Sequence, residues 1–143
     1  HDEASAFFGG LAGNAGLFST ARDVARVYQM LLNGGEIDGQ RYLSKETCQL
    51  FTTETSKISR RGLGFDKPDA DDPKKGNCAP AAPAEVYGHT GFTGTCAWVD
   101  PVNELVYVFL SNRIYPDVTN RKLNQLHIRE RIQGAIYDAM KKK

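Results

Sequence analysis

The sequence has few features that would direct the chain to a nucleic acid or into a membrane. Its 143 residues carry 18 basic and 17 acidic side chains, so the formal net charge of +1 provides no basic surface for nucleic acid. No apolar run approaches the roughly 20 residues that a membrane-spanning helix needs. The chain begins at His1 without a signal peptide, and we interpret it as a portion of a longer protein.

Cysteines are few and do not form a metal-binding pattern. Cys48, Cys78 and Cys96 are odd in number and lack Cys-x-x-Cys spacing, so neither a zinc site nor a disulfide framework is predicted. Cys48 and Cys96 lie in apolar patterns and are predicted to be core residues, whereas Cys78 lies in a polar segment and is predicted to be exposed. The acidic cluster at 69–72 fails the calcium-loop pattern, because the sixth position is not glycine and the twelfth is not glutamate. We predict no metal and no cofactor.

Glycine is concentrated near the N-terminus, in residues 9–16. This composition predicts a tightly turning backbone over residues 1–18 and no regular element there. A phosphate-binding loop is not predicted, because both glycine motifs of nucleotide sites are missing and no strand pattern precedes the segment.

Capping signals and apolar spacing predict a helix over residues 20–32. Thr20 can cap it together with Asp23 three residues later, and Gly34 with Gly35 supplies a left-handed stop. The apolar stripe expected to pack inward consists of Val24, Val27, Tyr28, Leu31 and Leu32.

Shorter elements follow this helix. Residues 37–42 predict a hairpin around an Asp-Gly turn, and Ser44 is predicted to cap a short helix with Cys48 and Phe51 inward. From Thr119 onward the pattern is again helical. The side predicted to be buried in this last helix consists of Leu123, Leu126, Ile128, Ile132, Ala135, Ile136, Ala139 and Met140.

Strand patterns occupy the middle of the chain. Residues 62–65 predict a short strand or an extended segment, residues 66–85 a mobile surface loop, and residues 87–90 an edge strand. Leu105–Leu110 is apolar on both alternating faces, which predicts a central strand covered on both sides. Trp98 is predicted to be a core residue. The fold class is therefore α/β (α+β), an antiparallel sheet flanked by helices.

Four segments resemble one known family in order and spacing. They are residues 1–3, residues 10–21, the run Tyr87-Gly88-His89-Thr90-Gly91-Phe92-Thr93-Gly94-Thr95, and residues 110–116, at the end of the strand predicted over residues 105–110. Together they resemble the C-terminal part of the penicillin-recognising serine hydrolases, which include class C β-lactamases and D-alanyl-D-alanine carboxypeptidases. The resemblance covers nearly the whole chain. It implies that residues 1–143 form one C-terminal portion of a β-lactamase/transpeptidase-like domain.

The resemblance also implies a site on the predicted edge strand, residues 87–90. His89 takes the place of the basic member of the family's Lys-Thr-Gly triplet, which is often His-Thr-Gly in carboxypeptidase-like members. Thr90 would contact the substrate carboxylate, and Gly91 would leave room for the substrate. The backbone amide of Phe92 would be one of two oxyanion-hole donors.

Two motifs of the family do not occur in the sequence. No serine has a lysine three residues later, and neither Tyr-x-Asn nor Ser-x-Asn is present. In the family both motifs precede the part that this chain resembles. The nucleophile and the general base are therefore expected outside residues 1–143.

Structural interpretations remain open for these residues. His89 can also be a strand histidine that bonds a neighbour, and Thr90 is an ordinary strand residue. Residues 111–113 can line a pocket or simply end a strand. His127, without metal ligands at suitable spacing, is predicted to be a surface residue.

The sequence thus predicts a C-terminal fragment of a serine hydrolase, inactive alone, whose parent forms an acyl-enzyme on D-alanyl peptides, β-lactams or esters. The expected partners are a small-molecule or peptidoglycan-peptide substrate, the upstream half of the domain and a second copy of the chain. The resemblance implies the bacterial cell envelope, periplasmic or secreted. The alternatives are a non-catalytic binding module and a structural domain attached to a cell-wall-active enzyme.

Overall fold

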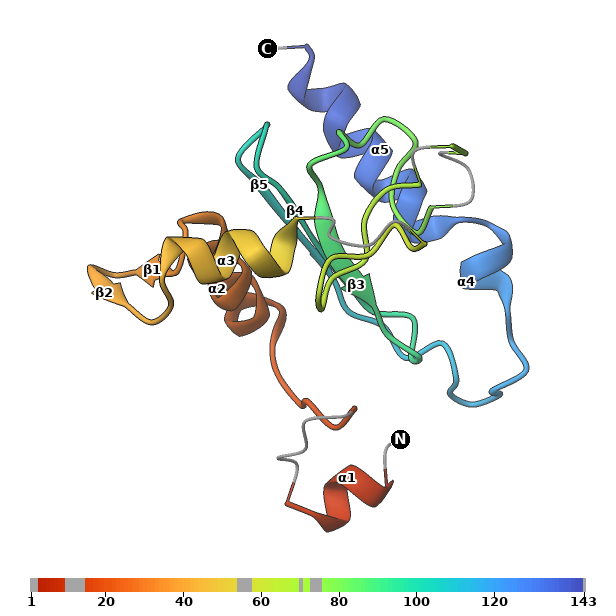
Figure 1. Cartoon of the computed structure of the whole chain (residues 1–143). Helices are drawn as coiled ribbons and strands as arrows, with labels where there is room; N and C mark the ends of the chain where they lie inside the picture. The colour runs from red at the N-terminus through yellow and green to blue at the C-terminus, as the bar shows by residue number, and fades with distance from the viewer. Residues whose placement is uncertain (1–2, 10–14, 54–57, 70, 73–75, 143) are drawn as a thin grey trace.

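The computed structural model describes residues 3–9, 15–53, 58–69, 71–72 and 76–142. Residues 1–2 and 10–14 of the N-terminal resemblance, and residue 70 of the acidic cluster, lie outside this part. Figure 1 shows the order of elements: α1 (Glu3–Phe7), α2 (Ala21–Leu32), β1 (Glu36–Ile37), β2 (Gln40–Arg41), α3 (Lys45–Thr52), β3 (Tyr87–Thr90), β4 (Cys96–Asp100), β5 (Leu105–Phe109), α4 (Lys122–Gln125) and α5 (Ile128–Met140). No helix among the described residues is long and apolar enough to cross a membrane.

The short helix α1 corrects the prediction that residues 1–18 contain no regular element. Ala4 and Ala6 favour a helix, and Glu3 in the first turn complements the helix dipole. Gly9 follows the helix at a φ of 79° and turns the chain away. In Figure 1 this helix lies apart from the sheet, near the bottom of the view.

Helix α2 begins and ends as its capping residues predict. The Thr20 hydroxyl accepts a hydrogen bond from the Asp23 amide at 3.2 Å and donates to the Asp23 carboxylate at 2.8 Å. Gly34 and Gly35 follow the helix at φ values of 66° and 95°, which confirms the left-handed stop. Val27 of the predicted stripe is exposed, while its other members are half-buried.

The predicted hairpin forms between β1 and β2, which pair antiparallel. Asp38 and Gly39 connect the strands at φ values of 52° and 75°, the positive values that a type I′ turn requires. Arg41 tightens the hairpin by donating to the Glu36 carboxylate and to the Gly34 carbonyl, each at 2.8 Å.

The predicted short helix α3 also forms. Ser44 caps it by accepting a hydrogen bond from the Thr47 amide at 3.1 Å. Cys48 is buried as predicted. Phe51, predicted to face inward, is 43% exposed, because its ring lies beside Gly64, which has no side chain to cover it.

The principal sheet has three antiparallel strands in the order β3-β4-β5. His89 lies opposite Ala97 across the first pair, and Trp98 lies opposite Tyr107 across the second. Strand β4 is therefore central and is buried along its whole length. The prediction that Leu105–Leu110 is central is wrong, because β5 is an edge among the described strands. Helices cover both faces of β5, and this burial explains why its side chains are apolar on both faces. Burial of the faces does not require another strand at its edge.

Residues 62–65 do not form a strand, which is one of the two forms predicted for them. The Gly62 amide donates to the Phe65 carbonyl at 3.0 Å, so the segment turns back on itself. Only the next residue, Asp66, bonds to the sheet, through two backbone hydrogen bonds with Gly88 at 2.7 and 3.0 Å. This isolated bridge fixes the segment beside β3.

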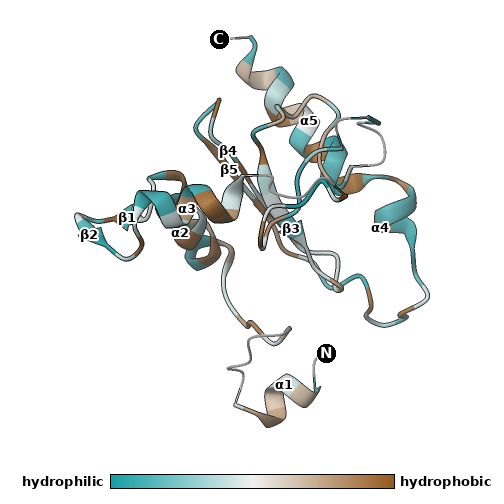
Figure 2. Cartoon of the chain, in the orientation of Figure 1, coloured by the Kyte–Doolittle hydropathy of each residue, from teal (hydrophilic) through white to brown (hydrophobic). Residues whose placement is uncertain are grey.

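Helices cover both faces of the sheet. On one face α2 packs against β4 and β5, and the Phe65 ring lies between Tyr28 of α2 and Tyr87 of β3, with ring centroids 6.1 and 5.4 Å apart. On the other face the Tyr107 hydroxyl donates to the Arg129 carbonyl of α5 at 3.2 Å. Figure 1 shows α2 and α5 on opposite sides of the strands, and in Figure 2 the hydrophobic colour follows β4 and β5.

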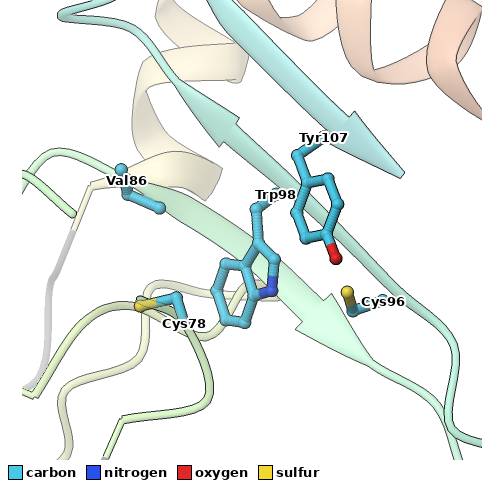
Figure 3. Packing of buried hydrophobic residues seen from close by; sticks show 5 residues of the cluster. All are labelled: Cys78, Val86, Cys96, Trp98 and Tyr107. Carbon is cyan, nitrogen blue, oxygen red and sulfur yellow. The ribbon is translucent and has the colours of Figure 1, made fainter. Parts of the chain in front are cut away.

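The hydrophobic core lies between the sheet and α5. Figure 3 shows five of its buried side chains, Cys78, Val86, Cys96, Trp98 and Tyr107. Cys96 and Trp98 are core residues as predicted, but the prediction that Cys78 is exposed is wrong, since it is only 3% exposed. The adjacent Ala79 amide donates to the Gln133 side chain of α5 at 2.8 Å, which holds this loop under the helix. The segment 66–85 is therefore partly core.

The C-terminal helical region forms two helices, α4 and α5, and α5 buries residues other than those predicted. His127, exposed as predicted, adopts the left-handed conformation at a φ of 48° and separates α4 from α5. The buried side of α5 is polar: Arg129, Gln133 and Tyr137. Their hydrogen bonds select this face, and the Tyr137 hydroxyl donates to the buried Asp100 carboxylate at 2.8 Å. The exposed members of the side predicted to be buried are Leu126, Ile132, Ala135, Ala139 and Met140.

Candidate functional site

The predicted site lies where β3 ends and the chain turns into β4. The Gly91 amide donates to the Thr95 carbonyl at 2.8 Å, and the Gly94 amide donates to the Gly91 carbonyl at 2.9 Å. Gly94 has a φ of 93°, which other residues rarely adopt. A Cβ atom on Gly91 would lie 2.3 Å from the Thr95 hydroxyl oxygen, so a larger residue here would force the Thr95 side chain to move.

Residues 111–113, in the segment that follows β5, bind the carbonyl of this turn. The Ser111 hydroxyl and the Arg113 amide donate to the Thr93 carbonyl at 3.0 and 2.9 Å. The segment that leaves β5 therefore stabilises the turn, and its Arg113 side chain also lines a pocket. Both interpretations of residues 111–113 hold.

His89 lies exposed on the face of β3 that α2 covers further along the sheet. Its Nδ1 is 2.7 Å from the Thr90 carbonyl oxygen, and its Nε2 is 3.2 Å from Nη1 of Arg61. A carbonyl can only accept a hydrogen bond, and a guanidinium can only donate one. The ring is therefore the neutral Nδ1–H tautomer, with Nε2 as acceptor.

Arg61 belongs to a charged group fixed beside β3. The buried Asp66 carboxylate accepts two hydrogen bonds from Arg60 at 2.8 and 3.0 Å and one from Asn77 at 2.9 Å. Nε of Arg61 lies 4.0 Å from the same carboxylate. Because Asp66 is bonded to Gly88 of β3, this carboxylate fixes the position of both arginines relative to the strand.

The Asp66 carboxylate is ionised in this environment. Burial alone would raise its pKa, but the hydrogen bonds from Arg60 and Asn77 and the charge of Arg60 outweigh burial and lower it. The same pairing raises the pKa of Arg60. The group is thus a charged network at neutral pH.

Thr90 points to the face opposite His89, as neighbours on a strand do. With Gly91 and Phe92 it lines an open pocket of about 470 Å³ between the strand end and the region of α4 and α5. The other lining residues are Gly76, Asn77, Arg113, Asn124, His127, Arg129 and Glu130. The structure therefore brings three of the four predicted site residues to one pocket and places His89 on the other side of the strand.

The walls of this pocket carry charge of both signs. The Arg113 guanidinium lies 5.0 Å from the centroid of the Phe92 ring, within cation–π range. Arg129 donates to the Asn124 side chain at 3.2 Å and lies 3.9 Å from the Glu130 carboxylate. Two buried atoms here, Nε of Arg129 and Oε2 of Glu130, have no hydrogen-bond partner among the described residues. A ligand or water with both donor and acceptor atoms can satisfy them.

Sequence reasoning missed Arg61 and Asp66. The apolar spacing that predicts helices and strands is absent between residues 52 and 61. Nothing in the order of residues indicates which of two adjacent arginines reaches His89. No group of three His, Cys, Asp or Glu side chains in the described part of the chain is placed to hold a metal ion.

Comparison with known proteins identifies the family. The family model described as Beta-lactamase matches residues 1–130. This chain belongs to the beta-lactamase family. Among its relatives, proteins named "Putative D-alanyl-D-alanine carboxypeptidase" from Escherichia coli O157:H7 and Escherichia coli K12 are 38% and 37% identical over 126 residues. The protein of that name from Salmonella agona is 36% identical over 125 residues.

The match covers most of this chain but a minor part of those relatives. It extends over 87% of the chain and 29% of each of the three proteins. The chain therefore spans less than a third of the length of these relatives, and the α+β architecture described above is consistent with a partial beta-lactamase-like fold.

Proposed function

We propose that this chain is the C-terminal part of a serine hydrolase that forms an acyl-enzyme with D-alanyl peptides, β-lactams or esters. The chain is inactive alone, because neither Ser-x-x-Lys nor Tyr-x-Asn occurs in it and acyl transfer needs an activated nucleophile. The nucleophile and general base come from the upstream half of the same domain. The family match and the names of the relatives support this reaction class.

The observation that carries the proposal is the end of β3. Thr90, Gly91 and Phe92 line an open pocket with polar walls. Thr90 and Gly91 belong to the His89-Thr90-Gly91 run that resembles the family triplet, and Phe92 follows it. In the proposed complex the Thr90 hydroxyl binds the substrate carboxylate, and Gly91 lets the substrate lie against the strand. The Phe92 amide stabilises the developing oxyanion, a contribution of about 3 kcal/mol for one donor. His89 is the residue in the basic position.

This function implies a location and a substrate source. Peptides that end in D-alanine belong to the bacterial cell wall, so we assign the parent protein to the cell envelope, periplasmic or secreted. Its partners are the peptidoglycan peptide or another small acyl substrate and the upstream half of the domain.

A chimera tests the proposal. The segment of the Escherichia coli K12 relative that aligns with this chain is replaced by this chain, and acylation by a fluorescent penicillin and release of D-alanine from a D-alanyl-D-alanine peptide are measured. We expect both activities in the chimera. The chain alone should show no acylation and should hydrolyse nitrocefin at the buffer rate.

Matched variants connect the activity to the pocket. Thr90→Val in the chimera should lower kcat/KM about 10- to 100-fold, since one hydrogen bond to a charged group is lost. Thr119→Val, at an exposed threonine outside the pocket, should leave it unchanged. A folded chimera that is not acylated, beside an acylated relative, would contradict the proposal and favour a non-catalytic binding or structural module. A serine of the isolated chain that is stably acylated would overturn its inactivity.

A further inference from the structure

Another open cavity, of about 380 Å³, lies between α5 and the loop that precedes β3. Figure 1 shows this loop beside α5, and the hydrogen bond from the Ala79 amide to the Gln133 side chain joins the two segments. Cavities of this size accommodate small organic molecules. The residues that line it indicate which chemistry such a molecule would have.

The walls of this α5 cavity are mostly apolar. Cys78 and Pro80 line it from the loop, and Gly134 lines it from α5. Burial chiefly, and the charges of Asp66 and Glu130 in addition, raise the pKa of the Cys78 thiol to about 12, so the thiol is neutral at pH 7. A neutral thiol packs like a small apolar group. The walls therefore favour the apolar body of a ligand.

Gly134 leaves space on the α5 side of the cavity. Glycine inside a helix lowers the stability of the helix relative to alanine. The backbone does not require glycine here, because Gly134 is not among the glycines with a positive φ. A Cβ atom on Gly134 would have no neighbouring atom of the described structure within 4 Å. Alanine would therefore fit the fold, and its absence keeps the cavity wider at this point.

The polar part of the cavity includes the carboxylate of Glu130. The Glu130 side chain is 11% exposed, and its Oε1 lies 3.9 Å from Nη2 of Arg129. Its Oε2 is buried and has no hydrogen-bond partner in the part of the chain that the structure describes. Such an oxygen calls for a donor, and a cationic donor forms the strongest hydrogen bond to a carboxylate. Arg131 and His127 also line the cavity, but both are exposed to water.

We propose that the α5 cavity binds a small organic ammonium ion. The apolar body of the ion packs against Cys78, Pro80 and Gly134, and its N–H groups donate to the Glu130 carboxylate. The proposal does not rest on the hydrolase function, because Cys78, Pro80 and Gly134 do not line the pocket at the end of β3.

Titration of the full chain of 143 residues with benzylammonium tests the proposal, with benzyl alcohol as a neutral probe of similar size. Backbone amide signals of Cys78 and Gly134 in ¹H–¹⁵N spectra report binding in the cavity. We expect benzylammonium to bind at least about tenfold more tightly than the alcohol, because only the ammonium forms a charge-assisted hydrogen bond. Glu130 also lines the pocket at the end of β3, so the Thr90 and Phe92 signals are followed as well and should shift less.

A charge variant tests the role of Glu130. Glu130→Gln keeps the shape of the side chain but removes its charge, so benzylammonium should bind about tenfold or more weakly while the alcohol binds as before. Glu46→Gln, at an exposed glutamate in the first turn of α3, is the matched control and should bind both probes like the unaltered chain.

Variants of Gly134 test the role of the open space. Gly134→Ala should raise the melting temperature of the chain without ligand, because alanine favours the helix and meets no neighbour, and it should weaken binding of both probes. Gly134→Leu takes up more of the cavity and should abolish binding. Weaker binding together with a higher melting temperature cannot result from misfolding, so the alanine variant remains decisive where the leucine variant does not fold.

Four results would overturn the proposal. The first is no binding of benzylammonium, and the second is equal binding of the ammonium and the alcohol, which is expected where water alone satisfies Glu130. The third is a response of Thr90 and Phe92 without one of Cys78 and Gly134, which would place the ion at the end of β3. The fourth is unchanged binding in Glu130→Gln or in Gly134→Ala. Failure of the acylation chimera would leave the ammonium site standing, and failure of these titrations would leave the hydrolase proposal standing.

Discussion

Asp66→Asn tests whether the charged network fixes the segment beside β3. Asp66 is 1% exposed and accepts from Arg60, Asn77 and the Lys67 amide at 2.8 to 3.0 Å. Asparagine keeps the shape but removes the charge and replaces one acceptor oxygen by a donor. Breaking a fully buried ion pair costs about 3–5 kcal/mol. The Arg60 side chain is 32% exposed and can regain water, so we expect a loss of about 2–3 kcal/mol.

The loss should depend on pH in a defined direction. The pKa of Asp66 in the folded chain lies below its ordinary value of 3.8, because the hydrogen bonds from Arg60 and Asn77 outweigh the opposing effect of burial. The stabilisation is therefore fully present above pH 3.8 and disappears as pH falls through the lower folded pKa. The difference in unfolding free energy between the two chains should be constant from pH 5 to 7 and shrink toward pH 2.

Urea denaturation followed by the fluorescence of the single tryptophan, Trp98, measures this difference, since that side chain is 1% exposed in the folded chain. Protein concentration is kept fixed, because association would change the apparent stability. Asp138→Asn, at an exposed carboxylate of α5, is the control and should change stability by less than about 0.5 kcal/mol. An Asp66→Asn chain as stable as the control, or a loss independent of pH, would refute the reasoning.

Three further predictions follow from the same structure. Burial raises the pKa of Cys78 to about 12 and that of Cys96 to about 11, so a thiol reagent should leave both, and the buried Cys48, unmodified in native buffer. Gly91→Ala should destabilise the chain by about 1–3 kcal/mol through overpacking, because its Cβ would lie 2.3 Å from the Thr95 hydroxyl. The chain should self-associate through the edge of β5 that no other described strand pairs with, because such an edge exposes backbone groups beside apolar side chains; sedimentation equilibrium should show a dimer.

Each of these predictions has a control. Labelling in denaturant should modify all three cysteines, and rapid native labelling of Cys78 would show that the loop does not lie under α5. The cost of Gly91→Ala, measured by urea denaturation, should largely vanish in a Thr95→Ala background, and an equal cost in both would exclude the clash. A strictly monomeric chain across the concentration range would show that the β5 edge is protected.

Local elements of this protein could be predicted from its sequence because neighbouring residues determine them. The Thr20 and Ser44 caps depend on side chains that reach amides three residues away. The hairpin turn depends on Asp38 and Gly39 tolerating positive φ. The family triplet at His89–Gly91 is likewise a contiguous pattern, so its place at the end of β3 followed from the sequence.

Contacts between distant segments decided the rest. Cys78 lies in a polar stretch, but the hydrogen bond from Ala79 to Gln133 places it beneath α5. Counting apolar residues predicted Ile136 correctly, which packs against the core, but it missed the buried polar residues of α5. Their partners lie elsewhere in the chain, such as Asp100 for Tyr137.

The candidate site also combines a local sequence pattern with contacts between distant segments. The sequence by itself determined that Thr90, Gly91 and Phe92 follow one another at a strand end. Only the tertiary structure decided that Arg61 reaches His89, because the isolated bridge from Asp66 to β3 brings together residues 28 positions apart. Hydrogen bonds and ion pairs across such separations leave no periodic trace in the sequence, since each depends on one pair of atoms rather than on a repeating face.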